Sequence, residues 1–153
     1  MDKIKRITSF EIDHRELNPG FYISRKDGDI TTYDLRTRKP NSGEYMDNVT
    51  MHTVEHLFAT YIRNSEIGDK VIYFGPMGCQ TGFYLLVDSV SDKQVFEVTK
   101  KVLSLIINHE GEVFGASEIE CGNYMTLELS SAKRECDKYL KVLKSVKSFS
   151  YGG

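Results

Sequence analysis

The chain has 153 residues, 40% hydrophobic and 27% charged, a composition that suits one globular domain over residues 1–153. Its 20 lysines and arginines against 22 aspartates and glutamates give a net charge of -2, which argues against nucleic acid and against an anionic membrane surface as partners. The charged N-terminus lacks the apolar stretch of a signal peptide or membrane span, so we expect a cytoplasmic protein with reduced cysteines.

The first third of the chain predicts an antiparallel hairpin. The β-prone runs 21–24 and 30–35 flank residues 26–29, which contain an Asp-Gly pair of the kind that forms tight turns between strands. We expect a further strand over residues 7–12 to join this hairpin.

A helix is predicted next. Either Asp47 or Asn48 can cap its N-terminus, because both side chains accept hydrogen bonds from the first free N–H groups of a helix. The apolar residues that follow recur at helical spacing and should face a core: Met51, Val54, Phe58, Tyr61 and Ile62.

Two β-prone runs, 71–74 and 82–90, follow this helix. Between them lie residues 75–79, where two glycines and a proline predict a tight turn that ends in Cys79. A buried structural thiol usually belongs to a strand or a helix face, so a thiol in such a turn is available for chemistry.

Two more helices are expected in the second half. Ser91 and Gln94 form a capping box for the first, which should end near Gly111 and carries the apolar positions Val95, Val98, Val102, Leu105 and Ile106. The second follows Ser130 or Ser131, with a core-facing stripe of Ala132, Cys136, Tyr139, Leu140, Leu143 and Val146. Early strands and later helices predict an α+β fold, in which helices pack on one face of an antiparallel sheet.

The predicted first helix carries His52 and His56 in the pattern HTVEH, with Glu55 beside them. Four positions are one helical turn, so both imidazoles can reach one cation, although a solvated helix face can also carry two histidines. The same pattern occurs in inverted-motif zinc hydrolases, where the glutamate acts as general base. A zinc metallohydrolase is therefore a rival interpretation.

Cys121, in the sequence ECGNY, offers a soft third ligand. Two imidazoles and a thiolate would hold a divalent ion with one open position, suited to polarising a substrate oxygen. Cys121 can equally be a loop thiol without a role, and a noncatalytic metal-stabilised protein is a third alternative. We expect Cys136 to serve only core packing.

The motifs HTVEH at 52–56, GPMGCQTGFY at 75–84 and ECGNY at 120–124 closely resemble the S-ribosylhomocysteine lyase (LuxS) family in order and spacing. The segments SFEIDH at 9–14 and YDLR at 33–36 extend this resemblance over most of the chain up to about Tyr124. The resemblance implies an α+β sandwich that forms a homodimer with its active sites at the subunit interface.

The resemblance also implies roles for single residues. His52, His56 and Cys121 would hold one divalent metal per subunit, Fe(II) natively, with Zn or Co as substitutes. Cys79 and Glu55 would be the acid/base residues, and the substrate pocket would be lined by Ser9, His14 and Arg36, which the partner subunit would supply.

The implied reaction starts from S-ribosylhomocysteine. Two successive aldose–ketose isomerisations are followed by β-elimination, which releases homocysteine and 4,5-dihydroxy-2,3-pentanedione, the precursor of autoinducer-2. The family is thus one of carbon–sulfur lyases that links the methionine cycle to quorum sensing. The residue inventory suits this chemistry, because an acid/base thiol beside a metal can move protons next to a carbonyl.

Overall fold

The computed structural model of the protein describes residues 4–7 and 10–152. It contains a four-stranded antiparallel sheet of order β1-β2-β4-β3. The strands are β1 Gly20–Asp27, β2 Ile30–Arg36, β3 Val71–Pro76 and β4 Gly82–Asp88. The helices are α1 Asn48–Arg63, α2 Asp92–Ile107 and α3 Leu129–Leu143, with short 3-10 turns η2 Gly68–Lys70 and η3 Tyr124–Thr126. The predicted α+β class is confirmed.

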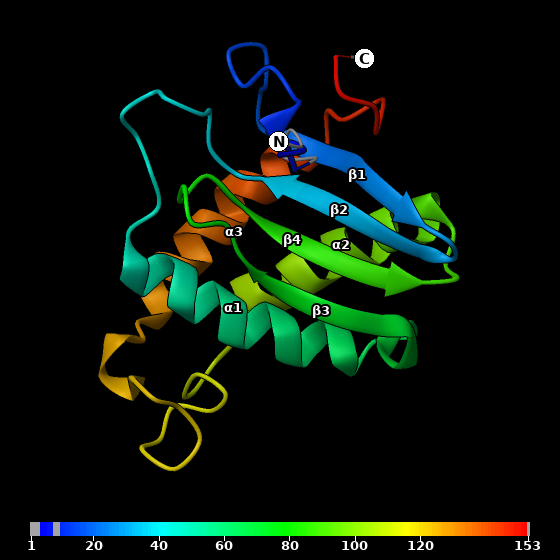
Figure 1. The fold of residues 1–153 in the computed structure, drawn as a ribbon. Coiled ribbons are helices and arrows are strands. Elements are labelled where there is room, and N and C mark those ends of the chain that lie inside the picture. The colour runs from blue at the N-terminus through cyan, green and yellow to red at the C-terminus, as the bar shows by residue number, and fades with distance from the viewer. Residues whose placement is uncertain (1–3, 8–9, 153) are drawn as a thin grey trace.

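Figure 1 shows how the layers are arranged. Helices α2 and α3 lie behind the sheet, and α1 runs along β3. Residues of all three helices line one buried cavity against the sheet, so the helices share one side of it. Tyr139 of α3 donates a hydrogen bond to the Gly20 carbonyl of β1 at 2.7 Å, which ties the two layers together. Aromatic rings link α1 to the sheet, because Phe58 stacks on Phe74 of β3 with ring centroids 4.2 Å apart. Among the described residues, no helix has both the length and the apolar character that a membrane crossing requires.

The predicted hairpin is confirmed as β1 and β2. Gly28 takes a positive φ of 60° in the turn, a conformation that glycine adopts without steric cost. The register shifts between Ile23 and Arg25, so β1 contains a bulge. Two hydrogen bonds meet backbone groups of the outer strands: Phe149 accepts from the Ile23 N–H at 2.7 Å, and Arg63 donates to the Val71 carbonyl at 3.2 Å.

The strand predicted over residues 7–12 is wrong for the part of it that the structure describes. Here the backbone bonds locally instead: the Phe10 N–H donates to the Ile7 carbonyl at 3.0 Å, and the Arg15 N–H donates to Asp13 at 3.0 Å. Phe10 is 61% exposed, so its side chain does not bury itself against the sheet. Local turn hydrogen bonds have therefore replaced strand pairing.

The helix predictions are confirmed in position and corrected at their ends. Asp47 caps α1 by accepting from the Thr50 N–H at 2.7 Å, and Ser91 caps α2 in the same way. Helix α2 ends at Ile107 rather than near Gly111. Leu105 is 44% exposed, not part of the core, because it lies off the stripe formed by Val95, Val98, Val102 and Ile106.

The other boundaries moved by a few residues. Strand β3 continues through Pro76, which was expected in the turn, and β4 ends at Asp88. Helix α3 begins at Leu129, before the predicted caps Ser130 and Ser131, and it ends before Val146, which was predicted to belong to it. Tyr61 of α1 was predicted to face the core and is only half-buried. Cys136 is 1% exposed within the core, as predicted.

Candidate metal centre and thiol pocket

Helix α1 places two histidines on one face, one turn apart. The rings of His52 and His56 meet edge to face with centroids 4.7 Å apart. Both side chains are half-buried because the segment between α2 and α3 covers this face. The same segment supplies Cys121, whose Sγ lies 3.3 Å from Nε2 of His52.

The donor atoms of these three side chains can meet at one ion. One ligand atom from each of His52, His56 and Cys121 lies within 4.8 Å of the other two. Imidazole nitrogen and thiolate sulfur suit Zn, Fe(II) and Co, and three protein ligands leave a position for substrate or water. Within the described part of the chain, the group has no fourth protein ligand.

Hydrogen bonds orient both imidazole rings. Nδ1 of His56 donates to the Phe114 carbonyl at 2.8 Å. Nδ1 of His52 lies 2.7 Å from the Thr126 hydroxyl, which accepts from it because that hydroxyl donates its own proton to the Asn123 carbonyl at 3.0 Å. Each Nε2 therefore keeps its lone pair for a metal, as in metal-binding histidines generally.

The electrostatics also suit a metal. Burial lowers the pKa of His52 and neighbouring His56 lowers it further, while the Glu55 carboxylate opposes this shift. The neutral imidazole that results is the form that binds a cation. The Asn123 N–H donates to Sγ of Cys121 at 3.4 Å, a contact that helps to orient the sulfur.

The segment between α2 and α3 is anchored to α1 at its start. His109 is buried; its Nδ1 accepts from the Tyr61 hydroxyl at 2.6 Å and its Nε2 donates to the Glu112 carbonyl at 2.8 Å. At Gly115 φ is +72°, and a Cβ there would lie 3.1 Å from Nδ1 of His56. Glycine thus lets the backbone pass directly against a ligand ring.

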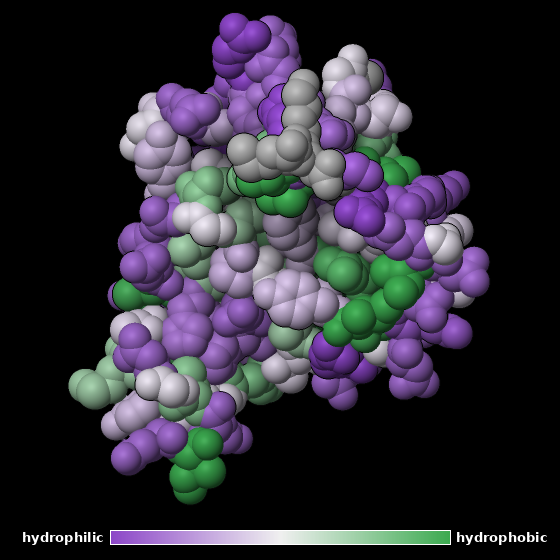
Figure 2. Space-filling model, in the orientation of Figure 1, coloured by the Kyte–Doolittle hydropathy of each residue, from purple (hydrophilic) through white to green (hydrophobic). Residues whose placement is uncertain are grey.

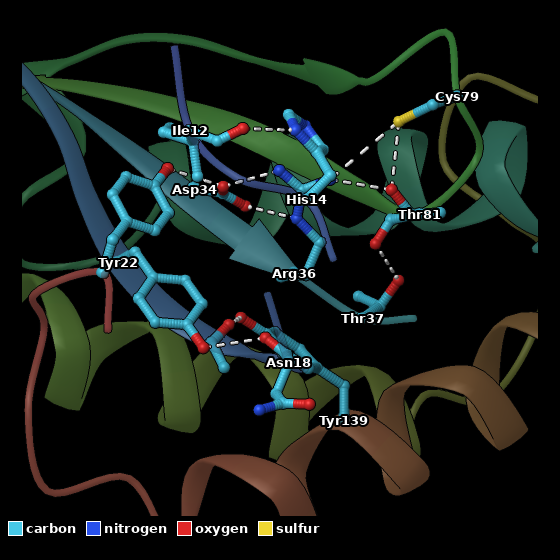
Figure 3. A network of polar contacts seen from close by, with 12 residues as sticks. Ile12, His14, Asn18, Tyr22, Asp34, Arg36, Thr37, Cys79, Thr81 and Tyr139 are labelled. Carbon is cyan, nitrogen blue, oxygen red and sulfur yellow. Dashed lines mark hydrogen bonds and ion pairs between the residues drawn. The ribbon is translucent and has the colours of Figure 1, made fainter. Parts of the chain in front are cut away.

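A second group of side chains lies on the sheet face opposite the helices (Figure 3). Cys79 is exposed in the turn between β3 and β4, with its Sγ 3.0 Å from the Thr81 hydroxyl and 3.9 Å from Nη1 of Arg36. Nη1 of Arg36 also donates to Thr81 at 2.8 Å. A pocket of about 330 Å³ opens beside them, lined by Phe10, His14, Arg36, Pro76, Met77, Gly78, Cys79 and Tyr84.

A buried ion pair fixes Arg36 in this pocket. Its Nε and Nη2 donate to the two carboxylate oxygens of Asp34 at 3.1 and 2.7 Å, and the two side chains are 3% and 1% exposed. Although burial opposes the charge, Asp34 raises the pKa of Arg36 above its usual value. A permanent cation is thereby held beside the Cys79 thiol, the kind of setting in which reactive thiols occur.

The predicted site residues thus fall into two groups. Cys79, His14 and Arg36 line the thiol pocket, and Nδ1 of His14 donates to the Ile12 carbonyl at 2.8 Å. Glu55 lies on α1 between the two histidines, and Ser9 lies outside the described residues. None of the eight residues that line the pocket is one of the three metal-binding candidates.

Sequence reasoning missed the residues that orient these side chains. Thr126 gives no local signal, because it follows its partner His52 by 74 positions. Asp34 did give one, since it precedes Arg36 by two positions, and alternate residues of a strand share a face.

The fold and both groups define a class of protein. It is an α+β protein with a candidate centre for a single metal, formed by two imidazoles and a thiol, and with a separate exposed thiol beside a fixed guanidinium. Such a centre suits Lewis-acid chemistry with acid/base assistance.

The sequence model of the S-Ribosylhomocysteinase (LuxS) family matches residues 7–149, so the chain belongs to this family. Similar relatives bear the name S-ribosylhomocysteine lyase. One from Borreliella afzelii is 45% identical over an aligned length of 150 residues, and the match covers 94% of this chain and 96% of the relative. One from Finegoldia magna is 45% identical over 94% and 95% of the two chains. One from Desulfotalea psychrophila is 41% identical over 97% and 99%.

Proposed function

We propose that the protein is an S-ribosylhomocysteine lyase, a carbon–sulfur lyase that forms homocysteine and the autoinducer-2 precursor 4,5-dihydroxy-2,3-pentanedione. The observation that carries this proposal is the His52, His56 and Cys121 group, with donor atoms within 4.8 Å, in a chain of the LuxS family. The relatives' names favour the lyase over the inverted-motif zinc hydrolase. We place the reaction in the cytoplasm, where the three free cysteines would stay reduced.

We propose that His52, His56 and Cys121 hold one divalent metal per chain, Fe(II) natively, with Zn or Co as substitutes. The donor set fits this group, because both imidazoles are oriented with Nε2 available and the thiol accepts a backbone hydrogen bond. When bound, the metal would supply a Lewis acid that polarises a substrate oxygen and acidifies the neighbouring C–H.

The proton transfers fall to Cys79 and Glu55 in this proposal. Cys79, whose Sγ lies 3.9 Å from Nη1 of Arg36, takes a proton from one ribose carbon and returns it to the adjacent one. Repeating this transfer moves the carbonyl along the sugar by two aldose–ketose shifts. Glu55 then exchanges protons at the later carbon and oxygen centres, and β-elimination expels homocysteine as a thiol.

Ser9, His14 and Arg36 are the proposed substrate-binding residues. His14 and Arg36 support this role by lining the same pocket as Cys79. Their imidazole and guanidinium nitrogens can donate hydrogen bonds to the hydroxyls and the carboxylate of S-ribosylhomocysteine.

We propose that the protein is a homodimer whose active sites lie at the subunit interface. The metal centre of one copy would then face the thiol pocket of the other, and each site would contain both groups. Exposed apolar side chains beside the two groups support this arrangement, namely Ile7 and Phe10 near the pocket and Ile119, Tyr124 and Met125 near Cys121. Figure 2 shows further hydrophobic surface over the sheet. Ile72 and Tyr73 of β3 are also exposed.

A thiol-release assay tests the activity. Metal-loaded protein incubated with S-ribosylhomocysteine should release free thiol, and Cys79→Ala should reduce the rate by about 10² to 10⁴, the usual contribution of an acid/base group. Metal content should be equal in both proteins, because Cys79 is not a ligand. Absence of thiol release from the metal-loaded wild type would refute the proposal, whereas peptide cleavage would support the hydrolase.

Complementation tests the shared site. Cys79→Ala and Cys121→Ser should each be inactive alone. Equal amounts, unfolded and refolded together in the presence of metal, should recover about a quarter of the wild-type rate, because half of the random dimers contain one intact site out of two. Failure to recover activity from a mixture that forms dimers would show that each chain uses its own pair of groups.

A further inference from the structure

The segment after α3 returns to the sheet and is anchored there. The Phe149 carbonyl accepts from the Ile23 N–H of β1 at 2.7 Å. Its ring packs edge to face on Phe21 and tilted on Phe96, with centroids 5.2 and 4.9 Å apart. The backbone bond and the two aromatic contacts fix the point from which the last residues cross β1.

Two positions later, Tyr151 reaches the buried ion pair. Its hydroxyl donates to Oδ2 of Asp34 at 2.7 Å, and its ring stacks on Tyr22 with centroids 4.8 Å apart and planes inclined by 19°. Burial, and then the Asp34 carboxylate, raise the pKa of Tyr151 well above its usual range. The hydroxyl therefore keeps its proton and remains a donor throughout the physiological pH range.

A continuous set of contacts leads from this hydroxyl to the reactive thiol. The carboxylate oxygen that accepts from Tyr151 also accepts from Nη2 of Arg36, at 2.7 Å. The third guanidinium nitrogen, Nη1, does not bond to Asp34; it donates to Thr81 and lies 3.9 Å from Sγ of Cys79. Figure 3 shows Asp34, Arg36, Thr81 and Cys79 in sequence across the sheet.

The tyrosine hydrogen bond changes how Arg36 shares its charge. A carboxylate that accepts a third donor has less negative charge to offer the guanidinium, and the effect is large where water is excluded. More of the field of Arg36 is then directed at Cys79. The same bond limits rotation of Asp34, and with it the guanidinium plane that places Nη1 near the thiol.

We propose that Tyr151 is a positioning residue for Cys79, acting through Asp34 and Arg36. Tyr151 lies beyond residues 7–149, the span that the family model matches, and this inference gives a role to the segment that follows that span. The effect on turnover rests on the proposed lyase function, whereas the effect on thiol reactivity does not.

The test compares Tyr151→Phe with Tyr22→Phe. Tyr22 is a matched control, because it is the stacking partner of Tyr151 and its hydroxyl donates to the Asn18 carbonyl at 2.7 Å rather than to Asp34. Each variant removes one hydroxyl from the same stacked pair and keeps both rings. The alkylation rate of Cys79 by iodoacetamide is followed from pH 5 to pH 10 by mass spectrometry of its peptide, alongside kcat and KM for thiol release.

In Tyr151→Phe, we expect iodoacetamide to alkylate Cys79 about 3- to 10-fold more slowly at pH 7, with the pH–rate profile displaced to higher pH. The reason is that the variant loses the charge-assisted hydrogen bond from Tyr151 to Asp34. We expect kcat to fall by about the same factor, with KM changed less, because proton transfer rather than binding is affected. Tyr22→Phe should match the wild type. His14 and Tyr84 face the same pocket as Arg36 and remain unaltered in both variants.

An alkylation profile of Tyr151→Phe that coincides with that of Tyr22→Phe would overturn the proposal, whatever its thermal stability. A chain that ends at Ser150 gives a second test, because it keeps the Phe149 anchor and loses the tyrosine. It should show at least the loss of Cys79 reactivity seen in Tyr151→Phe, and wild-type reactivity would again refute the role. If the wild type releases no thiol from S-ribosylhomocysteine, only the proposed function fails, since alkylation needs no substrate.

Discussion

The metal-binding group and the thiol pocket are assembled in different ways. Two of the three metal-binding candidates lie one turn apart on α1, and the segment between α2 and α3 supplies Cys121 and orients both rings. The thiol pocket instead combines Arg36 of β2, the β3–β4 turn and the segment that carries His14. Local helical spacing thus defines the first group, and sheet register together with a buried charge pair defines the second.

The largest expected effect is a loss of bound metal, which should follow a substitution in the metal-binding group but not one in the thiol pocket. Cys121→Ser should lose most of the bound metal after purification and dialysis, because a neutral hydroxyl replaces the thiolate ligand. Cys79→Ser is the control and should keep about one metal per chain, since Cys79 lies in the other group. Metal analysis by mass spectrometry measures both, and full metal content in Cys121→Ser would exclude that thiol as a ligand.

The next effect concerns the charge pair under the thiol pocket. Arg36→Gln should lower the free energy of unfolding by about 3 to 5 kcal/mol, because it leaves the carboxylate of Asp34 buried without its cation. Arg25→Gln breaks the exposed pair with Asp27 and should cost less than about 1 kcal/mol. Urea unfolding measures both, and equal losses would show that the pocket does not depend on its buried pair.

A smaller effect is expected from the hydroxyl that orients His52. Thr126→Val should weaken metal binding about 10- to 100-fold, the usual result of losing a partner of a ligand histidine. Thr126→Ser keeps the hydroxyl and should bind the metal as the wild type does. Competition with a coloured chelator gives the affinities, and unchanged binding in Thr126→Val would mean that packing alone holds the ring.

The smallest effect concerns the cap of α1. The Thr50 backbone N–H, and then its hydroxyl, lower the pKa of Asp47. The contribution of the ionised Asp47 cap to the free energy of unfolding is therefore full above the unfolded pKa of about 3.9, and it is lost as pH falls through the folded pKa. Asp47→Ala should cost about 1 kcal/mol at pH 7. The difference from wild type should shrink towards pH 2 in urea unfolding, and a constant difference would contradict the charge dependence.

The sequence allowed prediction of the features that depend on local spacing. The hairpin, the three helices, the Asp47 and Ser91 caps and the neighbouring histidines follow from residues within a few positions of one another. The strand predicted over residues 7–12 is wrong in its described part, because a local turn hydrogen bond from the Phe10 N–H to the Ile7 carbonyl replaces sheet pairing. The prediction that Leu105 faces the core is wrong, because a leucine next to the apolar stripe is hydrophobic in the sequence whether or not its side chain faces the core.

The parts of the site that sequence reasoning could not supply are long-range contacts. The Thr126 hydroxyl meets His52, and the Phe114 carbonyl meets His56, only after α1 and the segment between α2 and α3 have packed together. Every residue has a backbone carbonyl, so residue types alone could not identify the carbonyl that accepts from His56. The pair of Asp34 and Arg36 was also missed, although its two residues are only two positions apart on β2 and the contact is local.

The hydrogen bonds at the two outer strands bear on how the protein behaves at high concentration. An open strand edge is a template on which another chain can add, and long flat edges promote aggregation. Here the Phe149 carbonyl accepts a hydrogen bond from the Ile23 N–H of β1, beside a bulge. Arg63 donates to the Val71 carbonyl of β3. Both margins of the sheet are thus partly closed to strand addition, and shortening the chain before Phe149 would reopen one of them to self-association.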